Sequence, residues 1–268
     1  MKIGVLGKIT KVKSEDTILE LISFLQNLGY ETTRFHTPTE ISDVDVVIIL
    51  GGDGAILHSA VYAAKKDVKI IGINYGNLGF LTEYEKEEKE QIKELLSALE
   101  QNNCRILHRS LLQCEIAGRT FYALNEIAMQ RDFGSPNKAP TQILRLEVNS
   151  PEGVENVCGD GLLICTPTGS TAYSLSAGGA ILPPEVHVFM MTPVCAFSRR
   201  TRPTVFSDKS CFSVKVKTGR AVLLVDGLAV AQLPEGEEIR IQKAPFTADF
   251  PKRENSDFFE RVRNKLSE

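Results

Sequence analysis

The pattern of apolar residues changes near residue 105, and this change limits the chain to few folds. Over the first hundred residues, short apolar runs alternate with stretches that have the apolar spacing of helices. Strands are expected at 2–7, 30–35, 44–50 and 69–74, and helices at 15–28, 55–66 and 85–102. Alternation of this kind is typical of a parallel sheet covered by helices. We therefore predict a Rossmann-like α/β domain over residues 1–102.

After residue 105 the apolar runs are short, and turn-forming residues separate them. Strands are expected at 105–116, 120–130, 141–149, 161–166, 186–194, 211–217, 221–226 and 238–243. Turn sequences such as Ser150-Pro151-Glu152-Gly153 lie between these runs. This pattern predicts an all-β antiparallel sandwich over residues 103–250. From about residue 254 the spacing becomes helical again, which gives a separate C-terminal segment over 251–268.

Composition and charge exclude several classes of protein. The 268 residues are 43% apolar and 24% charged, which is typical of a soluble globular protein. The net charge of −3 gives no basic field to recruit nucleic acid. The six cysteines form no C-x-x-C pair and the four histidines no H-E-x-x-H, so we expect no zinc site. Without a signal peptide or an apolar run of membrane-spanning length, we expect a cytoplasmic protein that does not enter a membrane.

The segment Gly51-Gly52-Asp53-Gly54 places one carboxylate among three glycines where an apolar strand gives way to a helix. Glycine lets the backbone approach a ligand closely, and the N–H groups and partial positive charge of a helix start favour phosphate. Asp53 would repel phosphate unless it accepts a proton from an attacking hydroxyl, as in a phosphoryl-transfer site. The alternative is a tight turn in which the aspartate only caps the helix. These four residues by themselves leave both interpretations open.

A second loop, residues 166–179, follows the apolar run 162–165 and is rich in hydroxyls and glycines, with one aromatic residue, Tyr173. Hydroxyl and backbone N–H groups bind ribose and phosphate, and an aromatic ring can pack on a flat base. A structural turn rarely needs so many donors, so this loop favours nucleotide binding. The sequence contains neither a P-loop nor a G-x-G-x-x-G fingerprint. A nicotinamide cofactor would therefore be a substrate, held outside the usual dinucleotide fingerprint.

Together these loops resemble the NAD kinase family, and the family's motifs occur in order along nearly the whole chain. They are G-G-D-G at 51–54, G-I-N-Y-G-N-L-G-F-L at 72–81, L-N-E at 124–126, G-D-G at 159–161, T-P-T-G-S-T-A-Y-S at 166–174, V-D-G at 225–227 and D-F-F-E-R-V-R-N-K-L at 257–266. Diacylglycerol, sphingosine and phosphofructo-kinases share G-G-D-G, so that motif is weak alone. The long hydroxyl-rich loop is specific.

The resemblance implies transfer of the terminal phosphoryl group of ATP, or of another phosphate donor, to the 2′-hydroxyl of the adenosine ribose of NAD. Asp53 is the implied catalytic residue. The implied nucleotide-binding residues are Gly52, Gly54, Phe80, Asn125, Glu126, Asp160, Thr168, Thr171, Ala172, Tyr173 and Ser176. Mg²⁺ or another divalent cation would be held mainly by the nucleotide phosphates. The resemblance also implies a homodimer or homotetramer, and a C-terminal helix that packs on the N-terminal domain.

Three departures from the family pattern leave part of this interpretation open. Ala55 stands where the family usually has Thr or Ser, and Cys158 stands where many bacterial members have Arg. The family's C-P-H-S segment reads Cys195-Ala196-Phe197-Ser198. The first two departures concern the phosphate donor, which the sequence leaves open between ATP, another triphosphate and polyphosphate.

Two other functions compete with the resemblance. A lipid kinase of the G-G-D-G superfamily would need an amphipathic membrane face, which the sequence lacks. A catalytically silent nucleotide-binding sensor would fit the changes at Ala55 and Cys158, but the retained Asp53 argues against it. The pair Asp226-Gly227 is most simply a type I′ hairpin turn, with a role in the site as the alternative.

Overall fold

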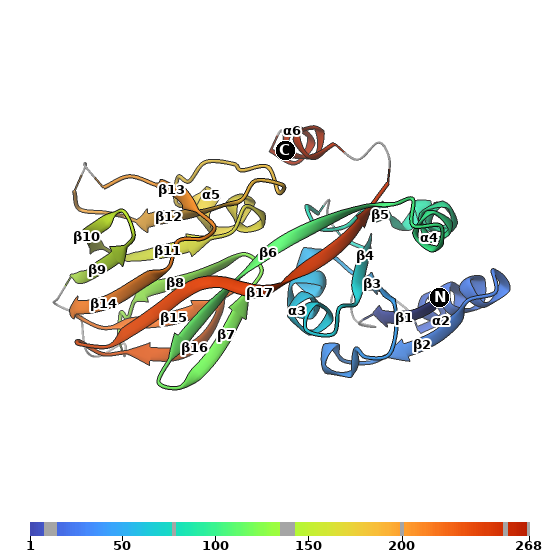
Figure 1. The fold of residues 1–268 in the computed structure, drawn as a ribbon, viewed down its shortest axis with the longest axis horizontal. Helices are drawn as coiled ribbons and strands as arrows, with labels where there is room; N and C mark the ends of the chain where they lie inside the picture. Colours follow the sequence, from blue (N-terminus) through green and yellow to red (C-terminus); the bar gives the residue numbers. More distant parts are fainter. Residues whose placement is uncertain (8–14, 77–78, 135–142, 199–200, 254–256, 267–268) are drawn as a thin grey trace. The chain divides into compact units, whose positions relative to one another are not determined.

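The computed structural model describes residues 1–7, 15–76, 79–134, 143–198, 201–253 and 257–266 (Figure 1). Residues 77–78 of the 72–81 motif lie outside these ranges. The chain forms two compact units. The first contains Met1–Arg109 and Phe246–Glu268, and the second contains Ser110–Pro245.

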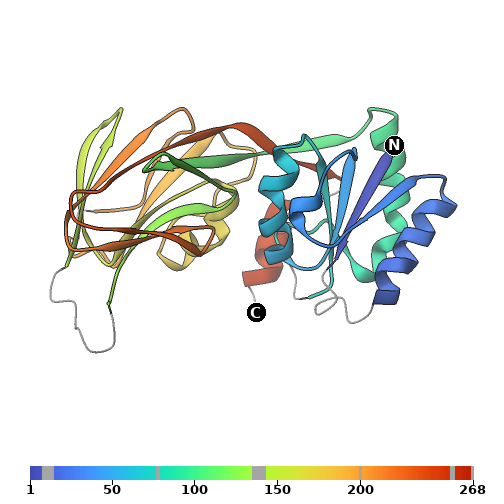
Figure 2. The same ribbon diagram turned by 90° about the horizontal axis from the view of Figure 1, so that it is seen from below.

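The first unit is built on a five-stranded parallel sheet with the strand order β2-β1-β3-β4-β5. Its elements are β1 (Lys2–Gly7), α2 (Glu15–Asn27), β2 (Glu31–Phe35), β3 (Val46–Leu50), α3 (Asp53–Ala64), β4 (Lys69–Asn74), β5 (Tyr84–Glu85) and α4 (Ile92–Glu100), with 3₁₀ turns at Pro38–Glu40 and Lys86–Gln91. Helix α3 lies on one face of the sheet, and α2 and α4 lie on the other (Figure 2). The predicted parallel α/β domain is confirmed.

The apolar periodicity of the sequence explains how the first unit packs. All five residues of β3 are buried, as expected for a central strand covered on both faces. Helix α2 buries Ile18, Leu21 and Leu25, which lie on one stripe at helical spacing. Register places Gly7, Leu50 and Ile73 level with one another at the carboxyl ends of β1, β3 and β4. Loops that follow these three strands therefore emerge at one edge of the sheet.

The second unit is a sandwich of two six-stranded sheets. One has the order β10-β9-β14-β17-β6-β7, and the other has the order β13-β12-β11-β8-β15-β16. The strands are β6 (Arg105–Ile116), β7 (Arg119–Ala123), β8 (Glu126–Arg131), β9 (Leu144–Ser150), β10 (Gly153–Gly159), β11 (Gly161–Cys165), β12 (Val188–Val194), β13 (Thr204–Ser207), β14 (Phe212–Thr218), β15 (Ala221–Val225), β16 (Leu228–Leu233) and β17 (Glu238–Lys252). A 3₁₀ turn (Thr168–Thr171) and the one-turn helix α5 (Tyr173–Ser176) follow β11.

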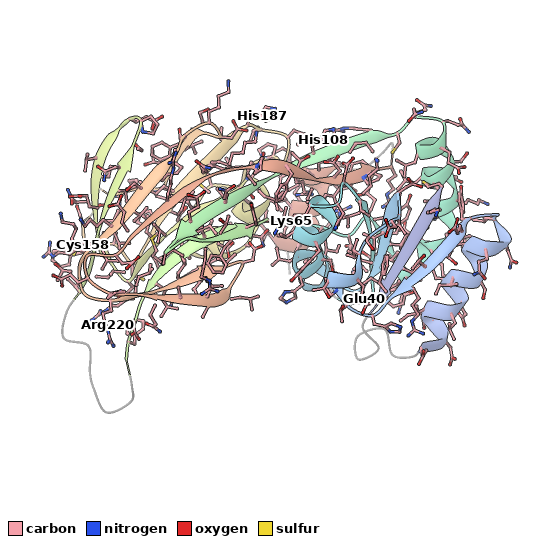
Figure 3. All side chains as sticks on the ribbon, turned by 60° about the horizontal axis from the view of Figure 1, so that its bottom comes forward. Glu40, Lys65, His108, Cys158, His187 and Arg220 are labelled. Carbon is pink, nitrogen blue, oxygen red and sulfur yellow. The ribbon has the colours of Figure 1, made fainter. Side chains whose placement is uncertain are left out.

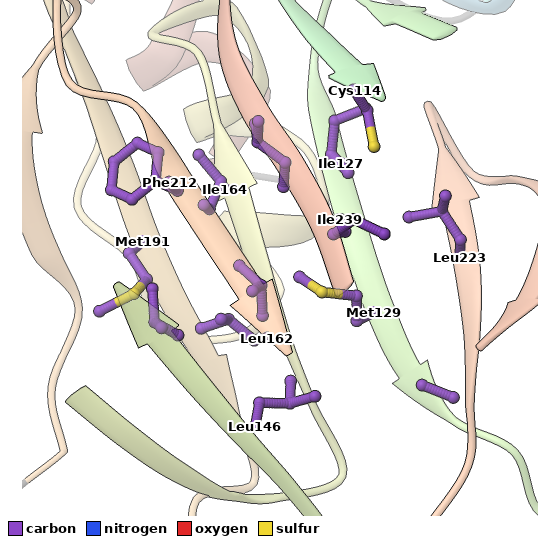
Figure 4. Packing of buried hydrophobic residues seen from close by; sticks show 14 of the residues in the cluster. Cys114, Ile127, Met129, Leu146, Leu162, Ile164, Met191, Phe212, Leu223 and Ile239 are labelled. Carbon is purple, nitrogen blue, oxygen red and sulfur yellow. The ribbon is translucent and has the colours of Figure 1, made fainter. Parts of the chain in front are cut away.

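Side chains from both sheets fill the core of this sandwich (Figure 4). Ile127, Met129 and Ile164 from one sheet lie in the same buried cluster as Leu146 and Phe212 from the other. The strand pairs of both sheets described by register are antiparallel. The predicted antiparallel sandwich is confirmed.

The C-terminal segment rejoins the first unit. Strand β17 continues to Lys252, and the chain ends in helix α6 (Phe258–Leu266). Arg261 of α6 donates a hydrogen bond to the carbonyl of Thr82, and its guanidinium lies 3.9 Å from Glu83. The expectation that a C-terminal helix packs on the N-terminal domain is confirmed.

The structure corrects several expected strand boundaries. The single strand expected at 120–130 is two strands in different sheets, because the chain crosses from β7 to β8 at Leu124 and Asn125. Strands β10, β13 and β16 were not predicted. All three are edge strands that are exposed over much of their length, so they lack the apolar alternation that marks a half-buried strand. Helix α3 begins at Asp53, two residues earlier than expected.

Candidate functional site

Asp53 is the first residue of α3, directly after Gly51 and Gly52 at the carboxyl end of β3. Its Oδ2 accepts the backbone N–H of Phe80 at 2.8 Å, and its Oδ1 accepts that of Leu81 at 2.9 Å. The carboxylate thereby ties the start of α3 to the loop after β4. An ionised carboxylate has about four lone-pair sites on its two oxygens, so Asp53 can accept further hydrogen bonds.

Glycines leave room around this carboxylate. A Cβ at Gly79 would lie 2.3 Å from Asp53 Oδ1, so a side chain there would displace the aspartate. A Cβ at Gly54 would meet nothing within 4 Å, and Gly54 is exposed. The N–H groups at the start of α3 have no residue in the helix to bind, and the helix dipole adds partial positive charge. This end of α3 can therefore bind an anion such as phosphate.

Lys265 brings a positive charge to Asp53 from the far end of the sequence. Its Nζ lies 3.5 Å from Asp53 Oδ2 and 4.2 Å from the centre of the Phe80 ring. Sequence analysis predicted Phe80 as a nucleotide contact, and in the structure its backbone N–H binds the carboxylate while its ring lies against the ammonium of Lys265. Lys265 was not predicted, because nothing in the spacing of a C-terminal helix shows which residue 212 positions earlier it meets.

Asn74 fixes the backbone directly after β4. It is buried at the end of β4, where its Oδ1 accepts the N–H of Gly76 at 3.0 Å and its Nδ2 donates to Glu85 at 2.9 Å. Asn74 thereby joins the backbone directly after β4 to Glu85 of β5.

A cavity of about 420 Å³ lies beside α3. It is lined by the ends of β1 and β3, by residues 36–39 after β2, and by Ala55, His58 and Tyr62 of α3. From β1 the sheet grows toward β2 on one side and toward β3, β4 and β5 on the other, so the strand order switches between β1 and β3. Open α/β sheets bind ligands at such switch points. The small side chain of Ala55 therefore faces this cavity.

In the second unit, Asp226 holds the segment that carries Asn125 and Glu126. Its carboxylate accepts the N–H groups of Leu124, Asn125 and Glu126 at 2.9, 2.8 and 3.1 Å. Asp226 and Gly227 both have positive φ, 47° and 78°, and form the two-residue turn between β15 and β16. The predicted type I′ turn is confirmed, and the same aspartate also positions a predicted binding segment.

Glu126 is buried, with 5% of its surface exposed, and its Oε2 has no hydrogen-bond partner in the described residues. Burial raises the pKa of its carboxyl to about 7, and the nearby Asp226 carboxylate contributes to the rise. A buried polar atom without a partner is costly, so such groups often mark a site that a ligand completes.

The hydroxyls of residues 166–176 mainly bind the protein itself. Thr166 donates to the carbonyl of Leu124 at 2.6 Å, Ser170 to that of Pro167 at 2.7 Å and Thr171 to that of Thr168 at 3.2 Å. These hydrogen bonds fold the loop tightly against the preceding segment. A Cβ at Gly169 would lie 2.2 Å from the carbonyl oxygen of Asn125, so the close approach requires glycine.

The remaining predicted residues of this unit lie around Tyr173. Its ring packs against the apolar cluster of Ala128, Leu163, Cys165 and Met190 on one face of the β8–β11–β12 sheet. Burial raises the pKa of Tyr173, and the negative charges of Cys195, Glu126 and Asp160 add to the effect. Asp160 lies 3.4 Å from the guanidinium of Arg131. Thr168 is buried, Ala172 is half-buried and Ser176 is exposed.

The structure thus gathers the predicted residues into two sets. Gly52, Asp53, Gly54 and Phe80 lie together in the first unit. Asn125, Glu126, Asp160, Thr168, Thr171, Ala172, Tyr173 and Ser176 belong to the second unit, mostly on and around the β8–β11 end of one sheet.

The described residues contain no group of three or more His, Cys, Asp or Glu side chains that could hold a metal ion. His108 pairs with Asp249 at 2.8 Å and His187 lies 3.6 Å from Asp208, in different units (Figure 3). All six cysteines are free thiols, and Cys158, labelled in Figure 3, is half-buried. Over the described part of the chain, no helix is both long enough and apolar enough to cross a membrane.

Sequence models of known families match both parts of the chain. The sequence model of the ATP-NAD kinase N-terminal domain matches residues 4–104, and that of the ATP-NAD kinase C-terminal domain matches residues 124–252. The chain belongs to the ATP-NAD kinase family. The two matches contain every predicted site residue, while helix α6 lies beyond them.

Individual members of the family extend this comparison. The chain is 32% identical to an NAD kinase of Methanothermobacter thermautotrophicus, covering 100% of this chain and 97% of the relative. It is 36% identical to an NAD kinase of Carboxydothermus hydrogenoformans, over 84% of this chain and 80% of the relative.

Two solved structures have the same fold. An NAD kinase from Archaeoglobus fulgidus in complex with ATP matches with a TM-score of 0.78 at 26% identity, covering 100% of this chain and 98% of that one. Yeast NADH kinase complexed with NADH matches with a TM-score of 0.83 at 24% identity, covering 100% and 87% of the two chains.

Proposed function

We propose that this protein is an NAD kinase, which transfers the terminal phosphoryl group of ATP to the 2′-hydroxyl of the adenosine ribose of NAD. The carrying observation is Asp53, a carboxylate at the start of α3 among glycines, in a chain whose two halves match the two domains of the family. The relatives named as NAD kinases and the solved structures with ATP and NADH support these substrates.

In the proposed reaction, the 2′-oxygen of NAD forms a bond to the terminal phosphorus of the donor. The bond between that phosphorus and the bridging oxygen breaks, and ADP leaves with the electron pair. The hydroxyl proton passes to Asp53, late in the step because a ribose hydroxyl holds its proton far more strongly than a carboxylate does. The N–H groups near Gly52 and Gly54 hold the donor phosphates, so the protein mainly orients the reactants and screens charge.

The second unit supplies the proposed NAD contacts. Asn125 and Glu126 offer an amide and a buried carboxylate with a partnerless oxygen to ribose hydroxyls and base edges. Tyr173 offers a half-buried ring, and Thr168, Thr171, Ala172 and Ser176 offer backbone groups and hydroxyls beside it. Asp160 adds a carboxylate whose charge contributes to the raised pKa of Tyr173.

We also propose that Mg²⁺ or another divalent cation enters with the triphosphate. Asp53 already accepts two backbone N–H groups, and the described residues form no metal-binding cluster, so this arrangement fits a cation held by the nucleotide. Such a cation, when bound, screens the charge of the phosphates.

The deciding assay is incubation of the protein with NAD, ATP and Mg²⁺, with NADP measured by a specific dehydrogenase. Parallel reactions use labelled ATP with lipid vesicles, or polyphosphate in place of ATP. Formation of NADP that the Asp53→Asn variant does not catalyse supports the proposal. Labelled lipid without NADP would make it a lipid kinase, and no phosphorylated product at all would favour a nucleotide sensor.

We further propose a cytoplasmic homodimer or homotetramer. Six free thiols fit a reducing compartment. In the second unit, Phe197, Val154 and Val205 are large apolar side chains that are 83%, 61% and 49% exposed, as expected of residues that an oligomer covers. Light scattering after gel filtration measures the number of subunits, and a monomer at micromolar concentration would contradict the proposal.

A further inference from the structure

We infer that Lys265, in the last helix, is a phosphate-binding residue of the kinase, whose ammonium screens Asp53 from the terminal phosphate of the donor. This inference rests on the proposed NAD kinase function. It assigns a catalytic contribution to a segment that the two matched domains do not contain.

The first support is the position of the ammonium. Lys265 Nζ lies 3.5 Å from Asp53 Oδ2, beside the glycine-rich start of α3. Charge-assisted hydrogen bonds between nitrogen and oxygen are about 2.7–2.9 Å long, so this ion pair is a loose one. About a third of the side chain is exposed, which leaves the ammonium accessible to a phosphate oxygen.

The second support is a contact that orients the side chain of Lys265. The Phe80 ring lies under Nζ at 4.2 Å, in a cation–π contact that limits where the ammonium can go. The backbone N–H of the same Phe80 binds Asp53. One residue therefore orients both the carboxylate and the lysine, which is the arrangement expected when both groups face one reacting phosphate.

The third support is the anchoring of α6. Arg261 is one helical turn before Lys265, on the same face, and it binds the carbonyl of Thr82 and lies beside Glu83. Val262, on this face too, is buried. Thr82 follows directly after Leu81, whose N–H binds Asp53. The helix is thus fixed to the loop that holds the carboxylate.

Buried ion pairs strengthen this anchor. Glu83 is 4% exposed and forms ion pairs with Lys252 and Arg261, and it accepts the N–H of Arg253 at 3.2 Å. Burial lowers the pKa of Lys252 to about 8, and the Glu83 carboxylate opposes that shift. Breaking such a pair by removing one partner is strongly destabilising. Arg261 and Lys252 are therefore structural, and Lys265 is the residue whose cation is left to face the anion-binding start of α3.

Charge explains why a cation is needed here. The terminal phosphate and Asp53 are both negative, so they repel each other at the short distance that proton transfer requires. The helix start contributes only about half an elementary charge. A lysine ammonium between the two groups offsets the repulsion and follows the charge as the phosphoryl group moves. In this role Lys265 acts through its charge and forms no covalent bond.

The competing interpretation is a partly exposed ion pair that only holds the end of α6 and contributes little to stability. Kinetics of Lys265→Met and of the matched control Arg263→Met separate the two. Arg263 is an exposed cation of the same helix, so its removal changes the helix charge equally. We expect Lys265→Met to lower kcat about 100-fold, in the range seen when one transition-state donor is removed. The KM for NAD and the melting temperature should stay close to wild type, and Arg263→Met should be unchanged.

Chemical rescue provides a readout that a structural role would not give. Adding ethylammonium to Lys265→Ala should restore part of kcat with saturation, and Lys265→Arg should retain more activity than Lys265→Met. Calorimetry with Mg–ATP alone should show at least about tenfold weaker binding to Lys265→Met than to wild type.

The inference is overturned if Lys265→Met keeps kcat within threefold of wild type. It is also overturned if the loss of kcat follows a fall in melting temperature and no amine restores it. Failure of the proposed function is a separate result, because then wild-type protein makes no NADP. In that case Mg–ATP binding to wild type and to Lys265→Met still tests the contact with phosphate.

Discussion

The two units build their candidate sites with different interactions. Around Asp53 the contacts are ionic or made by backbone N–H groups, with Lys265 and the start of α3 as the positive partners. Around Glu126 and Tyr173 the hydroxyls are used within the protein, and the carboxylate is buried with an unpaired oxygen. The first arrangement suits a moving negative charge, and the second suits a neutral ribose and a flat base that must be held in one orientation.

This difference changes the meaning of the hydroxyl-rich loop. Its composition suggested a row of donors for a ligand, whereas Thr166, Ser170 and Thr171 donate to backbone carbonyls of the protein. The hydroxyls fix the shape of the loop, and the proposed nucleotide contacts are then the ring of Tyr173 and the backbone around Ala172. The site of the first unit depends on charge and that of the second on the shape of a loop, so substitutions in the two units should affect different measured properties.

The largest effect is expected from Asp53→Asn. Loss of the proton acceptor should lower kcat about 10²–10⁴-fold, while NAD affinity changes little because the proposed NAD contacts lie in the second unit. Steady-state kinetics and calorimetry with NAD measure the two quantities. A variant that keeps more than half of wild-type kcat would remove Asp53 from the mechanism.

Among substitutions of glycine by alanine in the second unit, Gly169→Ala should lower the unfolding free energy the most. The added Cβ would lie 2.2 Å from the backbone oxygen of Asn125, and backbone cannot move aside as a side-chain end can. We expect a loss of about 1–3 kcal/mol in unfolding free energy, with weaker NAD binding. Gly54→Ala is the control in the first unit, because its Cβ would meet nothing within 4 Å and alanine favours a helix. Equal destabilisation of the two variants in urea unfolding would contradict the proposed close packing.

Glu126 should make the second unit more stable at mildly acidic pH. Its carboxyl ionises near 4.5 when unfolded and near 7 when folded. Between these values the folded state retains a proton that the unfolded chain has released, so protonation favours folding and this contribution is lost as the pH rises through 7. Compared with Glu126→Gln, wild type should lose roughly 1–3 kcal/mol between pH 5 and pH 8. Parallel pH dependence in the two proteins, measured by urea unfolding, would show that Glu126 is ionised throughout.

The smallest effect concerns NAD affinity. Tyr173→Ala and Asn125→Ala should each weaken NAD binding about tenfold, in line with about 1–3 kcal/mol for stacking of a base on an aromatic ring. Binding of Mg–ATP should change less than twofold, because the phosphate contacts are assigned to the first unit. Calorimetric titration of both variants with both nucleotides is the test. Equal losses of affinity for NAD and for Mg–ATP would contradict the assignment of NAD contacts to the second unit and phosphate contacts to the first.

The local pattern of apolar residues was enough to predict much of the fold. The alternation of buried runs and helical stripes identified β1, β3, α2 and α3, because a parallel sheet covered on both faces needs continuous apolar strands. Edge strands such as β10 and β16 escaped prediction because solvent on several sides removes the apolar alternation. The crossing from β7 to β8 was not predicted because the apolar residues 121–124 and 127–129 are separated only by Asn125 and Glu126, so the sequence does not show the change of sheet.

The sequence by itself determined the two-part architecture and the family resemblance, because apolar period, glycine turns and motif spacing are local properties. It also named Asp53, Asn125, Glu126 and Tyr173 as candidate site residues. Only the tertiary structure decided which distant groups meet those residues. Lys265 reaches Asp53 across 212 positions, and Asp226 holds the Asn125 segment across 101. The burial that raises the pKa of Glu126 arises in the same way. Ion pairs, desolvation and unpaired atoms depend on distances through space, and those distances exist only once the chain has folded.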